Sequence, residues 1–478
     1  MSDFVPPYPE RPRQALPALA ILRAARRNLL SIWEEQTYEY QFFSARVLLR
    51  WIFVCNSPDT VVQALIDRHH NFERKTPQMR YALQPLLGEG LFISDGATWA
   101  ARRRVVAPTV HVSRLPLFAP IMVEAAAERA ERWASLPPGT RIDALREMAT
   151  LTAEIICRTV FGRGLGAEHA TEVVAAFSEY QRLVGQLDLA YFLGLPDWLP
   201  RFHSRRLRLS AGRIHRVLEG IIAECKAQMA SGEPSMVRLL LEARDPETDQ
   251  GLTPAALRDE AAVIFMAGHE TTANALAWTW YLISQVPAVE ERLHREIDQV
   301  LRGGLPTLAD VPRLVYTRAV FEETIRLYPP VPILGRQALH DEEIRERRIP
   351  AGSLLLVVPW LLHRHRQLWD RPDHFIPERF LPENSLSRAK HAYIPFSTGP
   401  RICAGAAFGL TEAILCLAVL AQRATLRLAP GAVVEPVCRL TLRPGDSLPM
   451  LVEARVHGSP VKAEVGQHPP LVEPGDND

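Results

Sequence analysis

The stretch that most constrains this chain lies near its C-terminal end and reads Phe396-Ser-Thr-Gly-Pro-Arg-Ile-Cys-Ala-Gly405. Two glycines, Gly399 and Gly405, permit tight backbone turns on either side of a single cysteine, Cys403. An apolar, helix-favouring run follows over residues 406–420. Cys403 is therefore expected at a helix N-terminus, where free N–H groups and the helix dipole favour a thiolate. A lone cysteine before an apolar helix is more often an ordinary core residue, but a thiolate in such a loop also suits the axial ligand of a haem iron.

The composition is that of a soluble globular protein with a large core. At 478 residues, 47% hydrophobic and 23% charged, the chain is long enough for one large domain or for two or three ordinary ones. A formal net charge of +1 gives no bulk electrostatic case for binding nucleic acid or an anionic membrane. The six cysteines are scattered, without a Cys-x-x-Cys pair, which argues against structural zinc, an iron–sulfur centre and a disulfide framework.

No membrane anchor or secretory signal is apparent in the sequence. The early apolar run Ala15–Leu22 is short and follows a Pro-rich, charged leader. The closest candidate for a span starts at Thr271, but it contains Asn274, Gln285 and Pro287, which favours a buried core helix. We therefore expect a cytoplasmic protein without an anchor.

The residue pattern predicts a fold that is mainly α with a small β region. Residues 1–14 are Pro-rich and are expected to lie on the surface without regular structure, and the tail over 458–478 is expected to be disordered. Ser57 and Pro58 mark a helix start. The pattern further predicts strands over 37–43, 47–54, 352–359 and 439–452, an irregular segment over 72–94, helices over most of 116–300, and a looser lid over 180–201.

A second unusual stretch, Ala267-Gly-His-Glu-Thr-Thr272, lies inside a helix that is apolar on all sides. A glycine and a potential charge are costly in the middle of a buried helix. Local rules that are broken together in a core element suggest a functional site. A threonine pair that caps a helix break would be the structural alternative, but the helical pattern continues through Leu282.

Two weaker pairs lie at helical spacing. Trp99 and Arg103 are four residues apart and share one helix face, where both side chains could donate N–H groups to a carboxylate. Glu323 and Arg326 form an i, i+3 pair, a type that is commonly a solvated surface contact. Each pair alone is weak evidence for a function.

Together these stretches resemble the cytochromes P450. The family's Phe-x-x-Gly-x-Arg-x-Cys-x-Gly pattern is matched around Cys403, and its Ala-Gly-x-(Asp/Glu)-Thr pattern at 267–271. Its Glu-x-x-Arg pattern is matched at Glu323 and Arg326, with Pro377-Glu-Arg-Phe380 further on. The resemblance implies a single P450 haem domain over residues 15–457, and the absence of an anchor resembles the soluble bacterial type.

The resemblance implies haem b as cofactor, with Cys403 as the axial ligand of its iron. Ala267 and Gly268 would leave room for dioxygen, while Thr271 would supply a hydroxyl that Glu270 connects to a proton source. Glu323, Arg326 and Arg379 would form a buried structural triad. The other residues expected to bind haem are Arg401, Trp99, Arg103, Arg336, Phe396, Gly399 and Gly405, with Arg336 a weaker candidate for a propionate than Arg401.

The implied activity is monooxygenation of a hydrophobic small molecule, such as a fatty acid, terpene or steroid. Because the chain shows no flavin-binding fingerprint and no cluster-type cysteine set, electrons are expected from a ferredoxin or flavodoxin with its NAD(P)H reductase. Arg102 and Arg104 are candidates for docking that acidic partner. Peroxygenase, hydroperoxide isomerase and haem-based gas binding remain as alternatives, although the Glu270–Thr271 pair is not typical of the first two.

Overall fold

The computed structural model describes residues 3–162, 172–173, 175–177, 179–180, 183–184, 189–193, 203–227, 234–386, 388–438 and 440–455. The fold is mainly α with small sheets, as predicted. The helices are α1 (Ala18–Arg27), α2 (Pro58–Val62), α3 (Pro77–Leu87), α4 (Gly96–Val106), α5 (Leu115–Ala134), α6 (Ala144–Phe161), α8 (Leu189–Phe192), α9 (Arg205–Ala227), α10 (Met236–Glu242), α11 (Pro254–Gln285), α12 (Pro287–Leu301), α13 (Val315–Leu327), α14 (Pro359–Leu362), α15 (Pro382–Ser385) and α16 (Ala406–Arg423).

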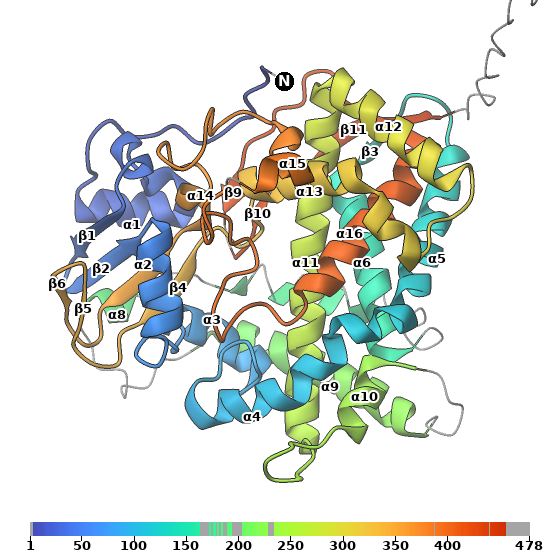
Figure 1. The fold of residues 1–478 in the computed structure, drawn as a ribbon. Coiled ribbons are helices and arrows are strands. Elements are labelled where there is room, and N and C mark those ends of the chain that lie inside the picture. Colours follow the sequence, from blue (N-terminus) through green and yellow to red (C-terminus); the bar gives the residue numbers. More distant parts are fainter. Residues whose placement is uncertain are drawn as a thin grey trace, which may run out of the picture.

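Helix α11 runs through the middle of the helical region, with α6, α13 and α16 packed against it (Figure 1). It begins at Pro254 behind a Thr253 side-chain cap and continues past Leu282, as the sequence predicted. Its C-terminal half is buried on all sides, and Trp278 stacks on Tyr328 with ring centroids 3.6 Å apart. This all-round burial explains why the helix carries no polar face.

The sheets are small and lie beside the helices. One has the order β1-β2-β7-β4 and another the order β3-β11-β8, while two-stranded pairs join β5 to β6 and β9 to β10. The strands are β1 (Phe42–Val47), β2 (Arg50–Cys55), β3 (Thr140–Asp143), β4 (Leu334–Gln337), β5 (Glu342–Ile344), β6 (Arg347–Ile349), β7 (Leu354–Val357), β8 (Ala424–Leu428), β9 (Val437–Cys438), β10 (Leu442–Arg443) and β11 (Pro449–Ala454).

Three local predictions were wrong. The first strand begins at Phe42 because Glu35–Tyr38 forms a 3₁₀ turn in which two successive residues, Thr37 and Tyr38, are both buried, which one face of a strand does not allow. Residues 72–94 contain the helix α3, capped by the Thr76 hydroxyl, although Pro85 and the following glycines obscured it. The strand β3 interrupts the helical region. The predicted lid over 180–201 falls largely outside the described residues.

Among the residues that the structure describes, two helical stretches are long and apolar enough to cross a membrane, and neither is the one singled out from the sequence. Residues 96–134 comprise α4 and α5 with 3₁₀ turns between them, so they do not form one straight helix. The other stretch is α16, which packs against α5, α12 and α13, and 72% of its most apolar window is buried. Core packing therefore accounts for the composition of α16.

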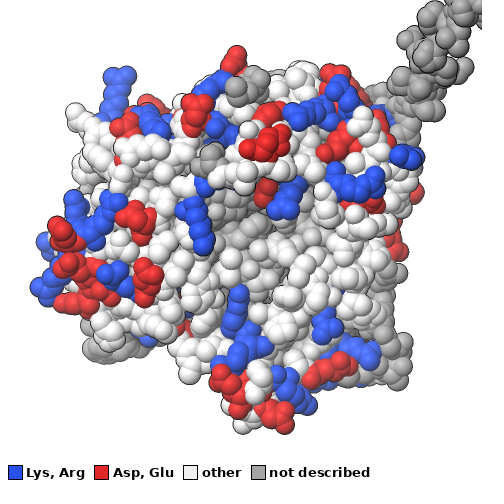
Figure 2. Space-filling view, viewed as in Figure 1, with Lys and Arg blue, Asp and Glu red and all other residues white. Residues whose placement is uncertain are grey.

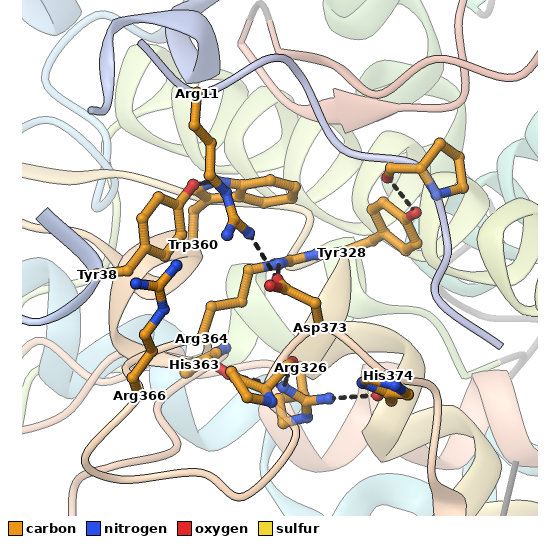
Figure 3. A network of polar contacts seen from close by, with 12 residues as sticks. Arg11, Tyr38, Arg326, Tyr328, Trp360, His363, Arg364, Arg366, Asp373 and His374 are labelled. Atoms are coloured by element: carbon orange, nitrogen blue, oxygen red, sulfur yellow. Dashed lines mark hydrogen bonds and ion pairs between the residues drawn. The ribbon is translucent and has the colours of Figure 1, made fainter. Parts of the chain in front are cut away.

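Residues 3–14 contain no helix or strand, yet they are tied into the core. Phe375 N–H donates to the Phe4 carbonyl (3.1 Å), and the Tyr328 hydroxyl donates to the Pro7 carbonyl (2.6 Å). The Arg11 guanidinium enters a buried polar network and donates to Asp373 at 2.6 Å (Figure 3). The expected disordered tail over 458–478 lies outside the described residues.

Candidate active site

The loop before α16 holds Cys403 through its own backbone. Cys403 N–H donates to the Phe396 carbonyl (2.9 Å), and Ile402 N–H donates to the Gly399 carbonyl (3.0 Å). Gly399 has φ +75°, and a Cβ there would lie 2.1 Å from the Leu65 carbonyl oxygen, so only glycine fits.

Gly405 differs from Gly399. It has φ −90° as the N-cap of α16, and an added Cβ would meet no described atom within 4 Å. The expected turn is present at residues 404–405, but its backbone conformation does not require glycine. Glycine at this position instead leaves open space on the cavity side of the loop.

Cys403 lies just before the N-cap of α16, with its side chain exposed to a cavity. Burial raises the pKa of its thiol, whereas the Gly405 N–H and the cations Arg103 and Lys75 lower it. The protein therefore surrounds the sulfur with groups that favour the thiolate, but burial outweighs them.

The cavity lies between this loop and α11, and it gathers almost every residue that the sequence singled out. Its lining contains the predicted haem-binding residues Trp99, Arg103, Arg336, Phe396, Arg401, Cys403 and Gly405 and the motif residues Ala267, Gly268, Glu270 and Thr271. Of the predicted haem-binding residues, Gly399 alone lies outside this lining. Most of the remaining lining is apolar and includes Met79, Leu91, Phe92, Val263, Ile264 and Ile333.

The motif on α11 presents a hydroxyl and a carboxyl group to the cavity. The Thr271 hydroxyl donates to the Ala267 carbonyl one turn earlier (2.6 Å), which occupies a carbonyl lone pair in the middle of the helix. The Thr152 hydroxyl of α6 donates to the His269 carbonyl (2.9 Å). These bonds fix the helix where Glu270 and Thr271 face the cavity.

Gly268 lines the cavity beside Ala267, and it also allows close packing of two helices. A Cβ on Gly268 would lie 2.7 Å from Ile156 Cδ1, so the glycine permits the close approach of α6. Ala267 is the motif residue whose small side chain is exposed to the cavity.

A cluster of cations faces the cavity at one end. Arg336 is 2% exposed, and its one hydrogen bond among the described residues is to the Gly335 carbonyl (3.0 Å). Burial and the neighbouring Arg401 lower its pKa to about 9. Burial likewise lowers the pKa of Lys75, and Arg336 and Arg401 lower it further. Arg401 stacks over the Trp99 ring at 4.7 Å.

Comparisons with known proteins identify the family and the fold. The family model described as Cytochrome P450 matches residues 9–445. The chain is 33% identical over 411 residues to Cyclooctatin synthase of Streptomyces melanosporofaciens, covering 85% of this chain and 87% of that protein. The chain belongs to the cytochrome P450 family.

Other relatives and solved structures agree. Cyclooctat-9-en-7-ol 5-monooxygenase of Streptomyces melanosporofaciens is 32% identical, covering 77% of this chain and 79% of that protein. Human Cytochrome P450 4V2 is 31% identical, covering 69% and 67%. The crystal structure of the cytochrome P450DA heme domain shares the fold with a TM-score of 0.77 at 24% identity, covering 95% of this chain and 98% of that one. The chain is a P450 monooxygenase, which takes haem, dioxygen, an organic substrate and electrons from a redox partner.

The cavity fits the haem of this P450 on three observations. Cys403 presents its sulfur to the space as an axial ligand would, and the open side of Gly405 provides room above the loop. Arg336 is buried and Lys75 is half-buried, and neither cation has a carboxylate partner among the described residues, whereas haem carries two propionates. Such buried charges require counter-ions.

The order of importance among the propionate candidates differs from the one expected. Both Nη atoms of Arg401 donate to backbone carbonyls, those of Glu73 and Ser94. Arg336, which the sequence placed behind Arg401, has most of its N–H groups uncommitted to described atoms.

Glu323, Arg326 and Arg379 come together behind the cavity. Arg326 donates to both carboxylate oxygens of Glu323 (2.6 and 2.8 Å), and Arg379 Nε lies 3.5 Å from Glu323 Oε1. Both Glu323 and Arg326 are fully buried. The predicted structural triad therefore has ion-pair geometry in this P450.

Sequence reasoning missed two residues of the site. Lys75 lies in a run of charged residues that suggests a solvated surface, and no pattern separates it from its neighbours. Glu412 of α16 lines the cavity at 1% exposure. Burial raises the pKa of its carboxyl group, and the nearby Thr272 hydroxyl opposes this rise. A glutamate in the middle of an apolar helix was a signal that could have found it.

Proposed function

We propose that this P450 oxygenates a largely hydrocarbon substrate of the terpene class in the cytoplasm, with electrons from a ferredoxin or flavodoxin and its NAD(P)H reductase. The observation that carries the substrate class is the distribution of charge in the cavity. Its apolar lining suits a substrate with few polar groups.

The cations argue against a fatty acid. A fatty acid needs a cation for its carboxylate, and the described residues of the cavity lining include four, namely Lys75, Arg103, Arg336 and Arg401. Arg401 already donates to two backbone carbonyls, and the other three lie around the Cys403 loop, where the two haem propionates would take them. The relatives support the same direction, because one is named for an unsaturated alcohol, cyclooctat-9-en-7-ol.

The residues of the site take the following roles in this proposal. Cys403 ligates the iron, and Arg336, Lys75, Arg103 and Trp99 receive the propionates. When bound, haem supplies the chemistry that inserts one oxygen atom into the substrate.

Proton delivery is assigned to α11. The Thr271 hydroxyl is positioned by its bond to Ala267, and it can release that bond to donate toward the cavity. Glu270, its neighbour at the cavity wall, carries the titratable group that can replace the proton.

The proposed electron donor docks on the face that carries the loop before α16. Lys and Arg residues lie along the border of the largely uncharged centre of this face, with Asp and Glu residues among them, and we assign the basic ones to contacts with an acidic partner (Figure 2). The earlier candidates Arg102 and Arg104 do not fit that role. Arg104 forms two 2.8 Å bonds with Asp245, and Arg102 lies 3.6 Å from the buried Glu260.

A spin-state titration of the purified ferric enzyme tests the substrate class. Terpene hydrocarbons and alcohols are compared with fatty acids of increasing chain length. We expect a saturable shift from low to high spin with the terpene series, because a ligand that fills the apolar lining displaces water from the iron. A shift with the fatty acids alone would overturn the proposed class.

The variant Thr271→Ala separates a monooxygenase that uses Thr271 from a peroxygenase or an isomerase. Loss of the hydroxyl removes the proposed proton route, so we expect electrons to be diverted to hydrogen peroxide. The ratio of product to NAD(P)H consumed should fall by roughly tenfold, since a positioned proton donor contributes at least that factor. An unchanged ratio would remove Thr271 from this role.

A further inference from the structure

One buried carboxyl group near the cavity takes no part in haem binding or proton delivery. Glu260 lies in the first half of α11 and is 0% exposed. Both of its oxygens accept the backbone N–H of Leu91, at 3.0 and 3.1 Å. Arg102 of α4 lies 3.6 Å away, and burial raises the pKa of Glu260 to about 7. Burial of an acidic side chain costs free energy unless its oxygens gain hydrogen bonds or a charged partner.

The segment that Glu260 holds is packed against α11 with little clearance. Gly88 has φ +53°, and a Cβ there would lie 2.0 Å from Asp259 Oδ2. A Cβ on Gly90 would lie 2.7 Å from Val263 Cγ2. The glycines thus let residues 88–90 lie directly on the helix, and the bond from Leu91 to Glu260 fastens the segment at its end.

This segment forms part of the pocket wall. Leu91 and Phe92 both line the cavity, directly after the residues that touch α11. Lys75 of the cation cluster lies 4.8 Å above the Phe92 ring. The Ser94 carbonyl accepts a bond from Arg401. The wall is therefore tied to α11 at Leu91 and to the haem-binding cations at Phe92 and Ser94.

Glu260 also lies on the same face of α11 as the motif residues Ala267 and Thr271. Ala267 and Thr271 follow it by seven and eleven residues, which places all three on one helical face, and Ile264 between them lines the cavity. A bond at Glu260 therefore fixes the wall relative to the face that carries Thr271.

We propose that Glu260 is a positioning residue that fixes the Leu91–Phe92 wall against α11 and so sets how a bulky hydrophobic ligand lies over the haem. The physical reason is the Leu91 N–H, which would otherwise be an unsatisfied donor in an apolar wall. The inference deepens the proposed function, but its test does not depend on the identity of the substrate.

The experiment compares Glu260→Leu, which removes the acceptor at similar volume, with Glu260→Gln, which keeps one. Glu290→Leu is the matched control, since Glu290 is also a buried acid, paired with Arg427 at 2.7 Å on the distant α12. Amide hydrogen exchange over residues 88–94 and the affinities for imidazole and for the bulkier 4-phenylimidazole are measured on each holoenzyme.

We expect Glu260→Leu to raise exchange at residues 88–94 and to weaken 4-phenylimidazole about tenfold, as loss of one buried hydrogen bond implies, while imidazole binds as before. Glu260→Gln should restore both values. Unchanged exchange and affinity in Glu260→Leu would overturn the proposal. Equal changes in Glu290→Leu would assign the effect to general destabilisation and would also overturn it. Failure of the terpene titration alone would leave this inference standing.

Discussion

Two buried arginines of this P450, Arg326 and Arg336, differ in the hydrogen-bond acceptors that surround them. Arg326, behind the cavity, donates to both oxygens of Glu323 and to the carbonyls of His363, Pro372 and His374, so every N–H group has an acceptor. Arg336, at the cavity, has one described acceptor although it is equally buried. The first arginine is satisfied by the chain itself, whereas the second requires an anion that the chain does not supply. A buried cation with no internal partner therefore marks a cofactor site, and a saturated one marks the structural frame.

The network around Arg11 and Arg364 is intermediate between these cases. Arg364 lies 3.4 Å from Asp373 and stacks 3.6 Å from the Trp360 ring, but its Nε and Nη1 have no hydrogen-bond partner among the described residues. Burial lowers its pKa to about 10. Two arginines share one carboxylate here, and aromatic faces supply the rest of the compensation (Figure 3).

The largest effect is expected from breaking the saturated pair. Arg326→Leu leaves the Glu323 carboxylate buried and three backbone carbonyls without their donor. Loss of one partner of a buried pair costs about 3–5 kcal/mol, so both the apoprotein and the holoprotein should be destabilised. Thermal unfolding and the yield of soluble holoprotein measure this. A stable Arg326→Leu apoprotein would contradict the structural assignment of the triad.

The sharpest contrast is expected from Arg336→Leu, with Arg326→Leu as its counterpart. Removing a buried cation that the chain does not compensate should leave the unfolding free energy of the apoprotein unchanged or raised. Haem affinity should nevertheless fall by roughly tenfold to a hundredfold, because a charge-assisted contact with a propionate is lost. Haem transfer to apomyoglobin measures the affinity. If Arg336→Leu destabilised the apoprotein as strongly as Arg326→Leu does, the distinction between the two arginines would fail.

The sequence predicted what depends on short motifs and missed what depends on assembly in space. The central helix, Cys403 and the Glu323–Arg326 pair are local patterns; the structure brings the first two together at one cavity and places the pair behind it. The role of Lys75 and the greater availability of the Arg336 N–H groups could not be predicted, because the chain pairs their backbones through a bridge between segments 261 residues apart. The packing of Gly268 against Ile156 on α6 could not be predicted either, because the two residues are far apart in the sequence. The helix α3 was missed because its proline and the following glycines are weak local signals for a helix.

The smallest effect is expected from Arg11, where the intermediate case can be tested. Arg11 lies between the rings of Tyr8 and Tyr38, at 4.1 and 3.9 Å, and donates to Asp373. Arg11→Met keeps much of the stacked volume, and Arg364 remains beside Asp373, so we expect a loss of only about 1–2 kcal/mol.

The control for Arg11→Met is Arg348→Met, which removes an arginine paired with Asp341 on the surface, where both side chains are more than half exposed. Exposed pairs contribute about 0–1 kcal/mol, so its unfolding temperature should hardly change. A loss in Arg11→Met as large as in Arg326→Leu would mean that Arg364 cannot hold Asp373 alone, and that the N-terminal segment belongs to the structural frame. No loss would mean that Arg364 fully replaces Arg11 and that the shared carboxylate is sufficient for either arginine. The expected intermediate loss of about 1–2 kcal/mol would mean that Arg364 replaces only part of the stabilisation that Arg11 gives to Asp373.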